Sequence, residues 1–206
     1  MWAYGGLEKK VHYYDVTSGK DIVLGEHEAP IKSIAVCIRG LILSGSWDKS
    51  IKGWSINTQY ETFTTKVSDK VYAMAVADYF LAVGTADKNV SVYDIRKMNE
   101  PFLSRNTGFT CHIRNICWVQ NNTGYAVASS EGKITVEFVT IPNKGFTFKC
   151  HRVSDPETNT MLVYPINALG VHPKYGTLAT GGSDGTVCLW DTESKRRITK
   201  LDLSSS

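Results

Sequence analysis

Short segments in which apolar and polar residues alternate recur along the whole chain, separated by turn residues. Residues 31–65 give the clearest example, where the alternation predicts four strands at Ile31–Val36, Leu41–Ser44, Ser50–Ser55 and Glu61–Thr65. No segment shows a sustained helical period of apolar residues. The pattern therefore predicts an all-β chain made of four-stranded antiparallel units joined by tight turns.

The four-stranded unit is repeated. Five stretches share a Gly or Ser, an acidic residue in a turn, and alternating strand residues that end near an aromatic. Their acidic anchors are Glu8, Asp48, Asp87, Glu131 and Asp184. The spacings of 40, 39, 44 and 53 residues lie near the roughly 40–45 residues of one WD-repeat blade. The sequence predicts one β-propeller domain over residues 1–206, with about five blades anchored near these residues.

Two features depart from a regular closed ring. The first repeat begins inside a strand pattern at Met1-Trp-Ala-Tyr4, with no residues for its earlier strands, which predicts a partial propeller with exposed strand edges. The longest interval contains a polar stretch between Arg152 and Leu162, which predicts a loop.

The composition argues against several classes of function. The 206 residues carry 23 basic and 20 acidic side chains, which gives a net charge of +3. A nucleic-acid-binding protein usually shows a concentrated basic stripe, and this sequence has none. No stretch reaches the roughly 18 apolar residues of a membrane span. The five cysteines form no Cys-x-x-Cys pair, so free thiols in a reducing compartment, cytosol or nucleus, are expected.

Apparent catalytic signals have structural explanations. Gly181-Gly-Ser-Asp-Gly185 matches the hydrolase elbow, but a strand follows instead of the required helix; a hydrolase using Ser183 is the alternative from a different class. Cys111-His112 and Cys150-His151 are neighbours that point to opposite strand faces, so core thiols and turn histidines are expected. The prediction is a non-enzymatic chain with no catalytic residues, no metal and no cofactor.

Strand polarity selects a candidate binding surface. In a meander, the start of the first strand, the second turn and the end of the fourth strand lie at one end. Trp47 and Lys133 fall in second-to-third-strand turns, Arg114 begins a first strand, and Arg152 is expected to end a fourth. Three cations and an indole on one rim predict a clamp for an anionic peptide.

Several motifs recur in the expected register along the chain. They include His27-Glu-Ala-Pro-Ile-Lys32, Gly45-Ser-Trp-Asp48, Val83-Gly-Thr-Ala86, Val92-Tyr-Asp-Ile-Arg96, Phe148-Lys-Cys-His-Arg152 and Ala179-Thr-Gly-Gly-Ser-Asp-Gly185. Together these motifs closely resemble a known family, the WD-repeat checkpoint adaptors that partner the Bub kinases. His27 with Asp48, Ser46 or Ser50, and Trp54 also resembles the buried hydrogen-bonded tetrad of WD blades. The related WD-repeat mRNA-export factor of the nuclear pore is the alternative, and the third repeat favours the adaptor.

The resemblance implies a seven-bladed ring of which this chain would supply blades two to six. It implies that the rim docks the acidic GLEBS segment of a Bub-type kinase and phosphothreonine in Met-Glu-Leu-Thr repeats of a kinetochore scaffold, in the nucleus and at mitotic kinetochores. Trp47, Lys133 and Arg152 match phosphopeptide-groove positions. Cys111 falls where relatives carry an Arg that meets docking-segment carboxylates, and Arg114 is the nearest replacement. Neither direct nucleic-acid binding nor membrane binding is implied.

Overall fold

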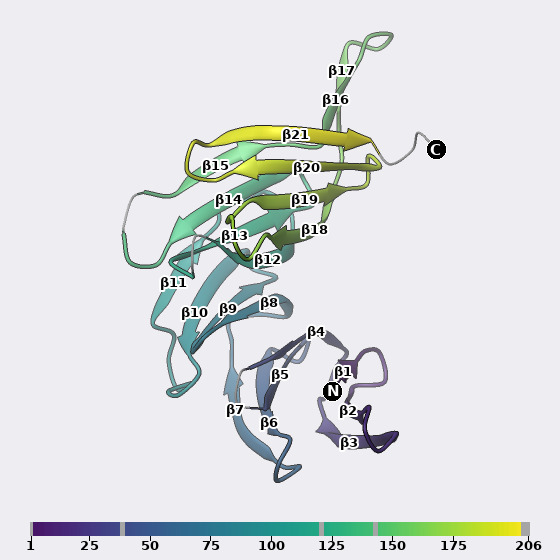
Figure 1. The fold of residues 1–206 in the computed structure, drawn as a ribbon, viewed down its shortest axis with the longest axis vertical. Coiled ribbons are helices and arrows are strands. Elements are labelled where there is room, and N and C mark those ends of the chain that lie inside the picture. Colours follow the sequence, from purple (N-terminus) through teal and green to yellow (C-terminus); the bar gives the residue numbers. More distant parts are fainter. Residues whose placement is uncertain (1, 38–39, 120–121, 142–143, 203–206) are drawn as a thin grey trace. The chain divides into compact units, whose positions relative to one another are not determined.

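The computed structural model describes residues 2–37, 40–119, 122–141 and 144–202. These residues form twenty-one strands and no helix, as the alternation predicts. The chain divides into two compact units, residues 1–106 and 107–206. In both, consecutive strands pair antiparallel as meanders (Figure 1).

The first unit contains one three-stranded and two four-stranded sheets. Their strands are β1 (Trp2–Gly5), β2 (Lys10–Asp15) and β3 (Lys20–Glu26), then β4 (Ile31–Val36), β5 (Leu41–Ser46), β6 (Ser50–Ser55) and β7 (Glu61–Lys66), then β8 (Val71–Ala77), β9 (Phe80–Thr85), β10 (Asn89–Asp94) and β11 (Leu103–Asn106). The four strands predicted over residues 31–65 are confirmed, with β5 two residues and β7 one residue longer than expected.

The second unit contains two four-stranded sheets and a separate hairpin. The strands are β12 (Ile113–Val119), β13 (Gly124–Ser129), β14 (Lys133–Phe138) and β15 (Phe146–Lys149), the hairpin β16 (Arg152–Asp155) and β17 (Thr160–Val163), and β18 (Ile166–Val171), β19 (Leu178–Gly182), β20 (Thr186–Asp191) and β21 (Arg196–Asp202).

The loop predicted between Arg152 and Leu162 is wrong, because this segment folds as the hairpin β16–β17. Val153 pairs with Leu162 across the two strands, and only residues 156–159 form the turn. The polar run is therefore the tip of a hairpin whose flanks carry enough apolar residues to pair. Figure 1 shows the hairpin extending away from the sheets of its unit.

Adjacent sheets face one another and bury apolar residues from both sides. Leu43 and Ile51 of one sheet pack with Val71, Leu81 and Val83 of the next. The second strand of a sheet lies between two apolar layers, so all six residues of β13 are buried. Because both faces of these second strands are buried, their sequences are rich in small and apolar residues instead of alternating with polar ones.

Candidate functional site

The first strand of each four-stranded sheet carries an irregularity at the same place. Register shifts occur between Ile31 and Ser33, Val71 and Ala73, Ile113 and Asn115, and Ile166 and Ala168. The skipped residues are Lys32, Tyr72, Arg114 and Asn167. A bulge re-aims the side chain of its extra residue, so each four-stranded sheet presents one such side chain at the same end of its first strand.

Arg114 occupies one of these bulge positions, as expected for a residue that begins a first strand. Its Nη2 donates to Oδ1 of Asn167, the bulge residue of β18, over 2.8 Å. The Asn167 amide in turn donates to Oγ of Ser183 over 2.7 Å. Sequence reasoning selected Arg114 and missed the other three bulge residues, although each follows an apolar residue in a pattern repeated at Ile31, Val71, Ile113 and Ile166.

Lys133 and Arg152 meet at Glu131, in the turn between β13 and β14. The Lys133 Nζ lies 2.8 Å from Oε2 of Glu131, and Nη2 of Arg152 donates to the Glu131 carbonyl oxygen over 3.0 Å. Nε of Arg152 is buried, with no hydrogen-bond partner in the described part of the chain. The structure thus brings two of the predicted cations together.

The expected position of Arg152 at the end of a fourth strand is wrong. The fourth strand, β15, ends at Lys149, and Arg152 begins the hairpin strand β16. Because of this, Arg152 is half-buried beside the Glu131 turn instead of standing free on a rim.

Glu131 is strongly held in its ionised form. Burial alone would raise its pKa, but bonds from Lys133, the Thr110 hydroxyl and the amides of Thr110 and Cys111 outweigh that effect and lower the pKa to about 2. The Thr110 amide and hydroxyl lie 2.8 and 2.6 Å from the two carboxylate oxygens. The carboxylate therefore orients Lys133 while its charge is shared among several donors.

Trp47 lies in the turn between β5 and β6 of the first unit, as predicted. Its side chain is 38% exposed, and the Lys70 Nζ lies 5.9 Å from its ring centroid. The indole therefore offers an exposed face for stacking. Its grouping with Arg114, Lys133 and Arg152, which belong to the second unit, stays a prediction.

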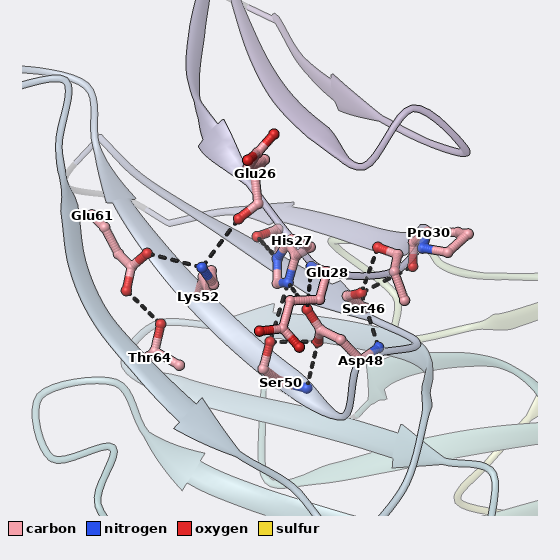
Figure 2. Close-up of polar contacts among 12 residues, drawn as sticks. Glu26, His27, Glu28, Pro30, Ser46, Asp48, Ser50, Lys52, Glu61 and Thr64 are labelled. Atoms are coloured by element: carbon pink, nitrogen blue, oxygen red, sulfur yellow. Dashed lines mark hydrogen bonds and ion pairs between the residues drawn. The ribbon is translucent and has the colours of Figure 1, made fainter.

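The predicted grouping of His27, Asp48 and Trp54 is present, but the serine that links His27 to Trp54 is Ser44, which the sequence did not single out. Figure 2 shows the contacts of His27 with Asp48 and Ser50. The His27 Nδ1 lies 2.9 Å from Oδ2 of Asp48, and Nε2 lies 2.7 Å from Oγ of Ser44. The Trp54 Nε1 donates to the same Ser44 oxygen over 2.8 Å. Since an ionised carboxylate can only accept and a neutral imidazole carries one N–H, Nδ1–H donates to Asp48, and Nε2 accepts from the Ser44 hydroxyl.

Neither of the two serines predicted for the tetrad links His27 to Trp54, and only Ser50 contacts the His27–Asp48 pair. Ser50 binds both His27 and Asp48, whereas Ser46 donates to the Ala29 and Pro30 carbonyls. The pKa of His27 is lowered, chiefly by burial, which keeps its ring neutral in this arrangement.

A second tetrad was missed from the sequence. The His151 Nδ1 lies 2.9 Å from Oδ1 of Asp184, and Nε2 lies 2.8 Å from Oγ1 of Thr180. The Trp190 Nε1 donates to that same threonine oxygen over 3.0 Å, and Thr186 takes the place of Ser50. His151 thus lies in the turn between β15 and β16, as expected, but its side chain is buried in the tetrad. Of the two cysteines expected in the core, Cys150 is buried and Cys111 is exposed.

Other reactive-looking residues are held in structural contacts. Ser183 lies in the hairpin turn between β19 and β20, as predicted, and its hydroxyl accepts from Asn167.

Over residues 2–37, 40–119, 122–141 and 144–202, no group of three or more His, Cys, Asp or Glu side chains is arranged to hold a metal ion. Within the same residues, no helix is long and apolar enough to cross a membrane.

Comparison with known proteins identifies the repeat. The WD40 family, described as WD domain, G-beta repeat, matches residues 20–55 and 157–191. The chain is a WD-repeat protein. It superposes on a chain of a solved structure described as "Crystal Structure of Mitotic Checkpoint Complex", with a TM-score of 0.82 over 99% of this chain and 61% of that one, at 18% identity. The predicted β-propeller fold is confirmed.

Curated relatives of this WD-repeat chain include two checkpoint proteins. It is 35% identical to Mitotic checkpoint protein BUB3.1 of Arabidopsis thaliana, over 94% of this chain and 59% of the relative. It is 34% identical to Mitotic checkpoint protein bub-3 of Caenorhabditis elegans, over 97% and 60%. The mRNA export factor GLE2 of Chaetomium thermophilum is 31% identical over 94% and 55%. The chain spans between 55% and 60% of the length of these three, and the resemblance to the checkpoint adaptor family is confirmed.

Proposed function

We propose that this chain is part of a non-enzymatic adaptor of the spindle assembly checkpoint that docks acidic and phosphorylated peptides. The observation that carries the proposal is the pairing of Lys133 and Arg152 at Glu131. The identity to Bub3-type checkpoint proteins supports the same role.

The cation pair has donors to spare for a phosphate. An ammonium has three donors and a guanidinium five, whereas Lys133 and Arg152 each use one in the contacts to Glu131. Phosphothreonine carries about −1.5 to −2 charges and three strong acceptor oxygens. Because Glu131 already fixes both cations, little side-chain freedom remains to be lost when a phosphate binds.

The acidic GLEBS segment of a Bub-type kinase is proposed to bind at the bulge residue Arg114. Arg114 is exposed and its guanidinium uses Nη2 on Asn167, which leaves further donors for a carboxylate. Cys111 is exposed and supplies no charge, so Arg114 is the cation proposed for this contact. Such an adaptor would act in the nucleus and at mitotic kinetochores.

Peptide titration tests the phosphate site. We expect the full-length protein to bind a Met-Glu-Leu-phosphothreonine peptide at least tenfold more tightly than the unmodified peptide, since charge-assisted bonds contribute roughly 1.5–3 kcal/mol each. Lys133→Met and Arg152→Met should each remove most of that preference. Trp47→Ala should weaken both peptides alike, because stacking does not sense the phosphate.

Lys149→Met is the matched control, because Lys149 is the cross-strand partner of Lys133 but is exposed. This variant should keep the preference. Calorimetry at fixed ionic strength is the measurement, since salt screens exposed charges within about 8 Å. Equal affinity of the wild-type protein for the two peptides would refute the phosphopeptide role.

A role in mRNA export is the second candidate, because GLE2 and the Poly(A)+ RNA export protein of Schizosaccharomyces pombe are also relatives, at 31% and 29% identity. Imaging the tagged full-length protein separates the two: enrichment at unattached kinetochores supports the checkpoint role, and a nuclear rim signal without kinetochore signal supports export. Labelling of Ser183 by a fluorophosphonate would instead favour the hydrolase alternative.

A further inference from the structure

Thr110 lies next to the two cations that are proposed to bind phosphothreonine. It belongs to the connection that follows β11 and precedes β12. Thr110 is exposed, whereas Phe109 before it is buried at 4% exposure. The buried phenyl ring anchors the connection, and the Thr110 side chain stays accessible to an enzyme in solution.

The Thr110 hydroxyl and the Lys133 ammonium bind the same carboxylate oxygen. Oγ1 of Thr110 donates to Oε2 of Glu131 over 2.6 Å, and Nζ of Lys133 lies 2.8 Å from that oxygen. The Thr110 amide donates to Oε1 of the same carboxylate over 2.8 Å. A single carboxylate oxygen therefore separates the hydroxyl from the ammonium, and both groups are held in place.

A phosphate on Thr110 changes which group Lys133 binds. Phosphorylation removes the hydroxyl hydrogen that Glu131 accepts, and it adds about −1.5 to −2 charges on three strong acceptor oxygens. Because the Glu131 carboxylate repels this phosphate and Lys133 attracts it, the ammonium is drawn from Oε2 to the phosphate oxygens. Arg152 lies at the same residue, since its Nη2 donates to the Glu131 carbonyl oxygen over 3.0 Å.

We propose that Thr110 is a phosphorylation site whose phosphate occupies Lys133 and Arg152 and closes them to a partner's phosphothreonine. This inference rests on the proposed function, because it assigns the same two cations to a phosphate of the chain itself. A ligand tethered beside its site has an effective concentration on the order of millimolar, so it competes well with a dilute partner.

A protein kinase supplies the phosphoryl group from ATP. Oγ1 of Thr110 attacks the γ-phosphorus, and the bond from that phosphorus to the bridging oxygen of ADP breaks. ADP leaves, and the hydroxyl proton passes to the base of the kinase. Hydrolysis of the phosphate ester restores the hydroxyl, so the closure is reversible.

Full-length protein with phosphothreonine incorporated at position 110 tests the inference by calorimetry at fixed ionic strength. A Met-Glu-Leu-phosphothreonine peptide should bind this protein at least tenfold more weakly than it binds the unmodified protein. Thr110→Val loses the same hydroxyl bond without gaining charge, so the phosphorylated protein should also bind at least about fivefold more weakly than this variant.

Phosphoserine at Ser194 is the control for added charge. Ser194 is exposed in the turn between β20 and β21, whereas Glu131 lies in a turn between second and third strands, at the opposite end of the sheets of this unit. Since salt screens exposed charges within about 8 Å, this control should change the affinity less than about twofold.

A second measurement follows the phosphate itself. In phosphorus-31 NMR titrations, the second pKa of the phosphothreonine at position 110 should rise by about half a pH unit or more in Lys133→Met, because a neighbouring cation favours the dianion. Lys149→Met removes an exposed cation of the neighbouring strand β15 and should shift this pKa by less than half as much.

The inference is overturned if the phosphorylated protein binds as tightly as the unmodified protein or as Thr110→Val, or if phosphoserine at Ser194 has the same effect. A phosphate pKa that ignores Lys133→Met, or a phosphorylated protein that is unfolded at the assay temperature, would also contradict it. Phosphopeptide mapping of protein from interphase and mitotic cells should find the Thr110 phosphate in at least one of the two, and its absence from both would count against the inference. Failure of the proposed function gives a different result, because the unmodified protein would then bind the phosphorylated and unphosphorylated peptides equally.

Discussion

Replacing Asp48 by Ala tests the energetic role of the His27 tetrad. The Asp48 carboxylate is 4% exposed and accepts hydrogen bonds from two segments, the connection between β3 and β4 and the start of β6. It accepts from His27 Nδ1 at 2.9 Å, from the Glu28 amide at 3.0 Å and from the Ser50 amide at 2.9 Å. Asp48→Ala removes the shared acceptor of these donors while the surrounding sheet stays in place, and leaves His27 only the longer contact of 3.1 Å to Ser50 Oγ.

The cost follows from counting the buried donors. A buried donor without a partner costs about 1–3 kcal/mol. His27 and Ser50 are 4% and 1% exposed, so their two donors carry most of the penalty, and water can replace part of the contact at the Glu28 amide. We therefore expect Asp48→Ala to lower the free energy of unfolding by roughly 3–4 kcal/mol. For a protein of this size that is about 10 °C in melting temperature.

Urea unfolding of purified protein is the assay, with Glu61→Ala as the matched control in the same blade. The Glu61 carboxylate is 37% exposed and pairs with Lys52 at 3.1 Å (Figure 2), so its loss should cost less than about 1 kcal/mol. A loss below 1 kcal/mol for Asp48→Ala, or one equal to that of the control, would refute the argument that the tetrad stabilises the blade by satisfying buried donors.

Three further outcomes are expected. Gly25→Ala places a Cβ 2.3 Å from Cζ3 of Trp54, and this overpacking should lower stability by about 1–3 kcal/mol in urea unfolding. Gly132→Ala should be destabilising in a thermal melt, because Gly132 has a φ of +62° and its Cβ would meet a backbone oxygen at 2.6 Å. Lys133→Met should flatten the stability profile in acid. The pKa of Glu131 lies at about 2, below its ordinary 4.5, so the stability it contributes is complete above pH 4.5 and lost towards pH 2. A profile unchanged by Lys133→Met would contradict that assignment.

The fold was predictable where the repeat is regular. Alternation and turn residues placed all four strands of residues 31–65 correctly, because β-branched and aromatic residues end at clear turns. The hairpin β16–β17 was missed since its polar tip dominates a short segment, and the apolar pair of Val153 and Leu162 is visible only once the two strands are in register.

The same hairpin explains why one tetrad was predicted and the other was not. His27 precedes Asp48 by 21 residues, and His151 precedes Asp184 by 33. The hairpin lies between His151 and its anchor, so the interval no longer matches the first repeat. Spacing identifies such partners only when no inserted element separates them.

Strand polarity could predict which end of a sheet a cation occupies, but it could not predict which carboxylate the cation pairs with. In the fourth repeat, Lys133 stands where Ser50 stands in the second, just before the buried Ile134 and Ile51. The anchor carboxylate of Glu131 is thus bound by Lys133 at 2.8 Å, whereas that of Asp48 is bound by His27 at 2.9 Å. Lys133 therefore has a structural role in its own blade as well as the proposed role in binding phosphate. The loss of peptide affinity in Lys133→Met therefore counts for the binding role only where it is larger than the fraction of protein unfolded by the variant's lower stability. Lys133→Arg keeps the positive charge for both contacts, so it should retain both the stability and the preference for phosphate.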